Sequence, residues 1–162
     1  MALPPFQTLL DHHGRDIHRF LIANVGPVDA DDCWQETWLS ALRAYPSLQD
    51  ASNLRGWVFT IAHRKVIDHV RARGRRAVPV AEAAELASAD AASADAATTV
   101  LPDQELWSLV AQLPDKQRIA VTLRFLIDSS YGEISEVMGT SEEAARRNVH
   151  EALKRLRKEL NR

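Results

Sequence analysis

Residues 131–158 read YGEISEVMGTSEEAARRNVHEALKRLRK, and this stretch predicts two helices separated by a short turn. Gly139 permits the tight turn, and Ser141 is a good N-cap for the second helix. The first helix carries an apolar stripe at helical spacing, made of Tyr131, Ile134, Val137 and Met138. A short helix, a Gly-containing turn and a longer basic helix are typical of a helix-turn-helix motif.

The second helix has two opposite faces. One arc of about 100° is apolar and holds Ala145, Val149, Ala152, Leu153, Leu156 and Leu160. The other side is basic and holds Arg146, Arg147, His150, Lys154, Arg157 and Lys158. In a helix-turn-helix motif the first residues of the second helix contact base edges. The basic side is therefore either a DNA-reading face or an ordinary solvated face.

Two acids open this helix. Glu142 and Glu143 suit the positive end of the helix dipole, and we expect Glu142 to act mainly in that way. Glu143 shares the basic face, so its carboxylate could also accept a hydrogen bond from a cytosine amino group.

Charge divides the 162-residue chain into segments, although the net charge is only −2. Residues 63–76 hold six Lys or Arg and one acid, and residues 141–162 hold seven basic residues and four acids. Between them, residues 77–105 hold six acids and no Lys or Arg. The near-neutral total therefore does not exclude a nucleic-acid partner.

The sequence predicts an all-α protein of two small helical domains joined by a flexible acidic linker. Strand signals are weak, and helical patterns cover roughly 5–23, 29–45, 53–73, 102–112, 115–127, 131–138 and 142–160. Residues 77–101 are rich in Ala, Ser and Asp and are typical of a flexible linker. The predicted domains are residues 1–76 and 102–162.

Two segments of the first domain are candidate interaction surfaces. Residues 29–45, DADDCWQETWLSALRAY, place Trp34, Trp38, Leu42 and Tyr45 at helical spacing, as a buried stripe or an exposed docking surface. Residues 53–76, NLRGWVFTIAHRKVIDHVRARGRR, form a helix whose predicted buried face holds Val58, Phe59, Ala62, Val66, Ile67 and Val70. Trp57 and Ile61 lie among the basic residues of the other side. Trp57 could stack on an unpaired base or pack on a neighbouring module or loop.

Other functions have little support in the sequence. We find no nucleotide-binding, hydrolase or zinc-protease motif, and therefore predict no enzymatic activity and no cofactor. His12, His13 and His18 could bind a metal, but surface histidines on an amphipathic helix are the commoner case. Cys33 is alone, which predicts a small buried residue in a reducing compartment. We see no secretory signal and no apolar run long enough to enter a membrane, so we expect a cytoplasmic protein.

These segments together resemble the sigma-70 family of bacterial transcription initiation factors, specifically its extracytoplasmic-function (ECF) group. Residues 30–45 resemble the region 2 helix that binds the β′ clamp helices of RNA polymerase. Residues 53–76 are similar to the segment that opens and reads the −10 element, and residues 113–157 resemble region 4, which reads the −35 element. The sequence departs from the family pattern at Ser135, at the acids that open the last helix, and at IDSS (127–130), which replaces a Gly-containing turn.

The resemblance implies a factor that binds core RNA polymerase and directs it to promoters, with no catalytic residues of its own. The implied partners are core polymerase (β′ clamp helices and β flap), promoter DNA and an anti-sigma factor. The implied polymerase-binding residues are Asp32, Gln35, Glu36 and Trp38. The implied −10 residues are Asn53, Arg55, Trp57, Ile61, Arg64, Lys65 and Arg71, and the −35 residues are Ser141, Glu143, Arg146, Arg147, His150 and Lys154. The alternative is a stand-alone helix-turn-helix regulator, which leaves the first domain unexplained.

Overall fold

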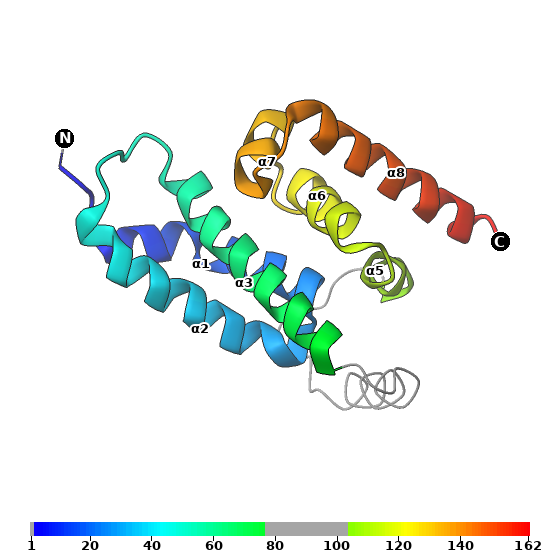
Figure 1. Cartoon of the computed structure of the whole chain (residues 1–162), viewed down its shortest axis with the longest axis horizontal. Coiled ribbons are helices and arrows are strands. Elements are labelled where there is room, and N and C mark those ends of the chain that lie inside the picture. The colour runs from blue at the N-terminus through cyan, green and yellow to red at the C-terminus, as the bar shows by residue number, and fades with distance from the viewer. Residues whose placement is uncertain (1, 77–103) are drawn as a thin grey trace.

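The structure is a computed structural model that describes residues 2–76 and 104–162. These residues form helices and no strand, which confirms the predicted all-α class. The elements are α1 (Phe6–Val25), α2 (Pro27–Ala44), the 3-10 helix η1 (Tyr45–Ser47), α3 (Leu54–Arg76), α5 (Gln104–Ala111), α6 (Asp115–Phe125), α7 (Tyr131–Met138) and α8 (Glu142–Leu160). Helices α1–α3 make the N-terminal domain and α5–α8 the C-terminal domain (Figure 1). The predicted linker, residues 77–101, lies outside the described residues.

A single glycine joins the first two helices of the N-terminal domain. Gly26 has φ 88° and ψ 161°, a conformation that a side chain disfavours, and Pro27 then begins α2 with its ring-fixed φ. Helix α3 packs on both α1 and α2. Phe20 of α1 and Phe59 of α3 meet edge to face, with ring centroids 5.7 Å apart. The first domain is therefore a three-helix unit with an aromatic contact at its centre.

Local caps define the helix-turn-helix of the C-terminal domain. The Ser130 hydroxyl accepts from the Glu133 amide at the start of α7, and Gly139 ends that helix with φ 65°. The Ser141 hydroxyl accepts from the Ala144 amide at 3.1 Å and begins α8, as predicted.

The apolar side of α8 packs on the domain as predicted, except at its end. Ala145, Val149, Ala152 and Leu156 are buried, and Leu153 is partly buried. Leu160 is 52% exposed, because it ends α8 where the helix projects beyond α5 (Figure 1). The two buried clusters of the domain also include Val110, Leu113 and Val121 from α5, α6 and the turn between them.

The two domains share one apolar core. Helix α7 packs on α3, and α6 packs on α1 (Figure 1). The buried cluster that begins with Phe20 and Phe59 continues without a break to Leu123, Ile127 and Val137 of the C-terminal domain. The described structure is thus a closed arrangement of both domains, and α8 lies on the side away from α1–α3.

Cys33 is a buried structural residue, as expected from the sequence. It lies in the core on α2 and is not in a disulfide. Burial raises the pKa of its thiol to about 11, and the carboxylates of Glu36, Asp29 and Asp32 add to the rise. A thiol held protonated in this way is a poor nucleophile.

The turn after α6 holds a residue other than glycine in the left-handed conformation. Asp128 has φ 61°, and the Ser129 amide donates to the Leu123 carbonyl across this turn. The geometry is that of a helix C-terminus in which a left-handed residue, most often glycine, is required. We expect Asp128→Gly to raise the free energy of unfolding by about 0.5–1 kcal/mol, because glycine relieves the Cβ clash. Urea unfolding measures the change. Asp128→Ala, which removes the charge and keeps Cβ, should give no such gain; an equal gain would assign the effect to charge.

Two partly buried histidines predict a loss of stability in mild acid. Burial is the main cause that lowers the pKa of His13 and of His63, with further lowering by Arg55 and Arg64 respectively. Each folded pKa lies below the usual 6.5, so the unfolded chain binds protons first as the pH falls. The contribution of the two neutral histidines to the free energy of unfolding is therefore complete above about pH 6.5 and is lost below it. From pH 7 to about 5.5, the urea midpoint of His13→Gln/His63→Gln should fall less than that of the wild type. Equal falls of the two urea midpoints would contradict the assignment of the acid sensitivity to these histidines.

Candidate polymerase and DNA interfaces

The basic face of α8 is open to solvent. Glu143, Arg146, Arg147, His150 and Lys154 are all exposed, at spacings of three and four residues that place them on one side of the helix. Helix α8 packs on α5, α6 and α7 and lies away from helices α1–α3 (Figure 1). Ser141 is used as the N-cap of the helix. The structure thus brings the predicted −35 residues together on one free face.

Within this face, Arg146 has fixed neighbours and Arg147 does not. The Arg146 guanidinium lies 3.0 Å from the Glu142 carboxylate and 5.2 Å from the ring centroid of Tyr131. Arg124 covers the same ring at 4.5 Å. Sequence reasoning assigned Tyr131 to an apolar stripe and missed this contact, since a tyrosine at that spacing is as easily a core residue.

The outer side of α2 carries polar and apolar residues together. Asp32, Gln35 and Glu36 are exposed, as predicted for a binding surface. Leu39 and Leu42 are 51% and 50% exposed beside them. Leu39 is four residues after Gln35, and Leu42 is three residues after Leu39, so the three side chains lie on one side of the helix. Leu42 belongs to the stripe that the sequence left open between core and docking surface, and the structure places it on the surface. Leu39 is a binding candidate that the sequence reasoning missed, although this spacing could have identified it.

The prediction that Trp38 is a docking residue is wrong. Trp38 is 5% exposed, and its ring meets Phe6 at 5.8 Å and Trp34 at 6.2 Å, both edge to face. Two residues after Glu36 is about 200° around a helix, so Trp38 faces the core when Glu36 faces solvent. The choice between core and surface for this aromatic stripe is settled in favour of the core.

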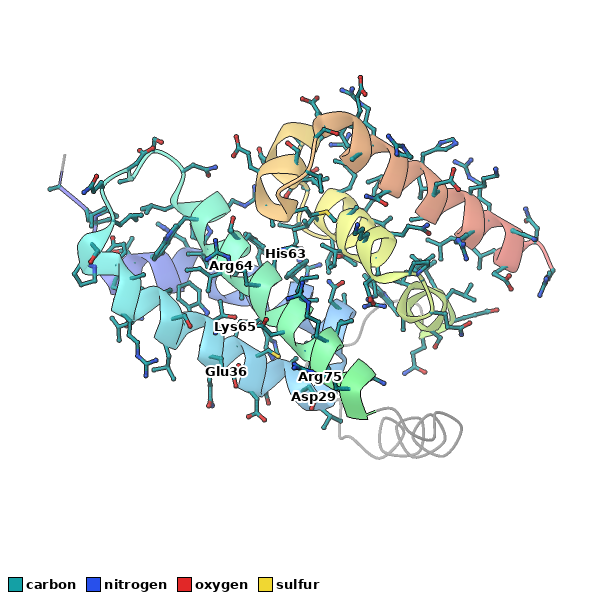
Figure 2. All side chains as sticks on the ribbon, viewed as in Figure 1. Asp29, Glu36, His63, Arg64, Lys65 and Arg75 are labelled. Carbon is teal, nitrogen blue, oxygen red and sulfur yellow. The ribbon has the colours of Figure 1, made fainter. Side chains whose placement is uncertain are left out.

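Helix α3 exposes fewer of its predicted −10 residues than expected. Arg64 and Arg71 are exposed, and Lys65 is half-buried. Figure 2 labels Arg64 and Lys65 on α3. Ile61 is only 9% exposed and belongs to the core, so its predicted place on an open basic face is wrong. Trp57 is half-buried and lies 6.1 Å from the Tyr45 ring. Helix α3 packs on α1, α2 and α7, so less of its surface is open than the sequence suggested.

Two other predicted −10 residues contact the C-terminal domain. The Asn53 side-chain amide donates to the Glu136 carboxylate at 3.3 Å, and its oxygen caps α3 at the Gly56 amide. Arg55 donates to the Ile127 carbonyl and lies 3.6 Å from the Glu133 carboxylate. The structure places these side chains at the edge of the domain interface, where Asn53 remains exposed and Arg55 is half-buried.

A buried polar pair also crosses the interface. The Asn24 amide nitrogen donates to the Thr122 hydroxyl at 3.0 Å and to the Phe20 carbonyl at 2.9 Å. The Asn24 side-chain oxygen is buried and, among the described residues, has no hydrogen-bond partner. An unpaired buried oxygen costs free energy, so this contact weakens the closed arrangement as well as fixing its register.

The histidines of the N-terminal domain do not form a metal site. Across residues 2–76 and 104–162, no three His, Cys, Asp or Glu side chains are placed to bind a common ion. His18 pairs with Asp31 at 2.8 Å at the edge of a groove of about 430 Å³ between α1 and α2. Among the same residues, no helix has the length and hydropathy to cross a membrane.

Comparisons with known proteins agree with this architecture. The family model for Sigma-70 region 2 matches residues 9–76, and that for Sigma-70, region 4 matches residues 103–156. The ECF RNA polymerase sigma factor SigD of Mycobacterium tuberculosis is 34% identical over 149 residues, which cover 88% of this chain and 70% of SigD. SigM of Bacillus subtilis, also an ECF RNA polymerase sigma factor, is 30% identical over 150 residues, covering 91% and 90% of the two chains.

Solved structures show the same fold at lower identity. The sigma factor RpoE of Bartonella quintana, in complex with the anti-sigma factor NepR, matches with a TM-score of 0.75 at 22% identity over 98% of both chains. CnrH, in complex with the cytosolic domain of CnrY, matches with a TM-score of 0.70 at 22% identity over 96% of this chain and 87% of CnrH. With a region 2-like and a region 4-like domain in order, the chain belongs to the ECF group of the sigma-70 family and is a transcription initiation factor that directs RNA polymerase to promoters.

Proposed function

We propose that the outer side of α2 binds core RNA polymerase, that α3 captures the −10 element and that the basic face of α8 reads the −35 element. The observation that carries the proposal is the exposure of two chemically different faces, one on α2 and one on α8. A stand-alone regulator would need only the second of them. The factor itself performs no catalysis and needs no cofactor, and it works in the cytoplasm.

Further partners follow from the family. The β flap of polymerase is the expected contact of the C-terminal domain. An anti-sigma factor is the expected inhibitor, since the similar sigma factor RpoE was solved as a complex with such a protein.

The α2 surface has the composition of a protein-binding patch. Leu39 and Leu42 provide exposed apolar area, and Asp32, Gln35 and Glu36 surround it with polar groups. Interfaces commonly have an apolar centre that is desolvated on binding and a polar rim that gives orientation. We assign the centre of the clamp-helix contact to the two leucines.

We expect Leu39→Ala to weaken binding to core polymerase without destabilising the fold. Loss of a desolvated anchor costs about 1–2 kcal/mol, which is roughly a five- to thirtyfold rise in dissociation constant. The measurement is co-elution and titration with core enzyme in the absence of DNA, together with thermal unfolding. Leu160→Ala, at a similarly exposed leucine outside this surface, is the matched control. Unchanged affinity for Leu39→Ala would exclude this surface, and failure of the wild type to bind core enzyme would overturn the proposed function.

The closed arrangement must open before all the proposed −10 residues can meet DNA. Asn53 and Arg55 are occupied by Glu136, Glu133 and the Ile127 carbonyl. The carboxylates of Glu133 and Glu136 also lie where a negatively charged DNA strand would approach these residues, and like charges repel. We infer that promoter capture follows separation of α7 from α3.

The interface is suited to opening because its polar contacts are weak. Glu133 is about half exposed, and ion pairs in such positions contribute about 0.2–1 kcal/mol. The buried Asn24–Thr122 pair leaves one oxygen unpaired, which water can hydrate when the domains separate. The apolar core favours the closed arrangement of the two domains. The weak ion pair of Glu133 and the unpaired oxygen of Asn24 limit how strongly that arrangement is favoured.

Two variants should shift this equilibrium in opposite directions. Glu133→Gln/Glu136→Gln weakens two exposed contacts and should favour opening by about two- to thirtyfold. Asn24→Leu/Thr122→Val replaces an imperfect polar pair by apolar groups of similar shape and should favour closure. The measurement is binding of each holoenzyme to single-stranded DNA carrying the −10 element. Glu151→Gln/Glu159→Gln makes the same charge change on α8, which packs on α5, α6 and α7. Changes in the same direction for both test variants would contradict the proposed opening.

A further inference from the structure

Three side chains from three helices form a stack beside the start of α8. The Tyr131 ring, at the start of α7, lies 4.5 Å from the guanidinium of Arg124 of α6 and 5.2 Å from that of Arg146 of α8. The Arg124 guanidinium also donates to the Ser129 carbonyl at 3.0 Å. The ring is half-buried. The stack therefore links the exposed Arg146 to anchored groups of the domain.

Arg146 is also held from within its own helix. Its guanidinium lies 3.0 Å from the Glu142 carboxylate, one turn earlier. Both side chains are more than half exposed, at 59% and 52%, so water screens the pair and its contribution alone is small. Together, however, the carboxylate and the aromatic ring restrict a long side chain from two directions.

The neighbouring arginine provides an internal contrast. Arg147 is exposed on the same face, and within the described part of the chain it makes no hydrogen bond, ion pair or ring contact. The two arginines therefore differ in freedom although they are adjacent and both directed to solvent. A free arginine loses rotamer entropy when it binds a base, whereas a fixed one has lost it already.

We propose that Tyr131 and Glu142 are positioning residues that hold Arg146 in the pose in which it reads a guanine, and that they thereby set base preference at one position of the −35 element. The proposal rests on the proposed function of α8 as the −35 reader. Arginine contacts guanine through two parallel hydrogen bonds to O6 and N7, which requires a defined guanidinium plane. Groups that fix this plane favour guanine over other bases.

This role accounts for an acidic residue where DNA phosphates approach. Glu142 suits the helix dipole, as the sequence suggested, but its ion pair with Arg146 gives it a second role that the dipole argument omitted. Its negative charge lowers the overall attraction to DNA. The same carboxylate restrains the Arg146 side chain through their ion pair. The two effects have opposite signs and can be separated by experiment.

The test is selection of −35 sequences from a randomised pool by holoenzymes carrying Glu142→Gln, Tyr131→Leu, Tyr131→Phe, Arg146→Ala or Arg147→Ala. Arg146→Ala should abolish preference at one position. Glu142→Gln and Tyr131→Leu should each reduce preference at that same position by about three- to tenfold, and Glu142→Gln should raise affinity for all sequences. Tyr131→Phe, which keeps the ring, should retain the preference, and Arg147→Ala should act at a different position.

The outcomes distinguish the positioning role from the proposed function. If Arg146→Ala relaxes one position while Glu142→Gln and Tyr131→Leu leave it intact, α8 reads DNA but the positioning role is wrong. A uniform rise in affinity for Glu142→Gln with unchanged preference would likewise reduce Glu142 to a charge effect. If Arg146→Ala leaves the selected sequence unchanged, Arg146 is not a reader and the positioning role is wrong. If Arg147→Ala also leaves it unchanged, the proposed function of α8 is wrong as well. Glu142 is exposed on the helix surface, so its variant remains informative if Tyr131→Leu is destabilised.

Discussion

Packing of α6 and α7 against α1 and α3 is the interaction on which the arrangement of the molecule depends. Each domain is small, and small domains bury too little apolar surface to be very stable alone. Here Phe20 and Phe59 continue into Leu123, Ile127 and Val137, so that each domain completes the core of the other. The same contact places Asn53 and Arg55 against α7 and the turn before it. Stability and access to the −10 residues are therefore linked through one surface.

The helices could be predicted because their limits are encoded locally. Ser141 caps α8 through its own hydroxyl, and Gly139 ends α7 in a left-handed conformation. The exposed basic face of α8 could also be predicted, since a helix that packs by one stripe leaves the other free. Trp38 could not be placed with the same certainty. An aromatic stripe is compatible with a core or with a docking surface, and only the packing on Phe6 and Trp34 decides between them.

The contacts between domains could not be predicted from any pattern in the sequence. Arg55 and Asn53 precede a basic segment, and both residue types serve equally in DNA binding and in domain packing. Their partners, Glu133 and Glu136, are more than seventy residues away in the chain. The burial of Ile61 could not be predicted either, because it depends on how other helices pack on α3. The segment IDSS (127–130), by contrast, was noted in the sequence for lacking a glycine, and within it Asp128 adopts a φ of 61°.

The position of the α2 surface restricts how polymerase can open the molecule. Helix α2 packs on α1 and α3, while α1 and α3 carry the contacts to the C-terminal domain, so α2 lies on the opposite side (Figure 1). In the proposed function, polymerase can therefore dock on Leu39 and its neighbours while the domains are still closed. A contact that is equally available in both states cannot shift the balance between them. Opening must then be driven by groups that become free only on separation, namely the polar side chains of the interface and the faces of α3 and α7 that it covers.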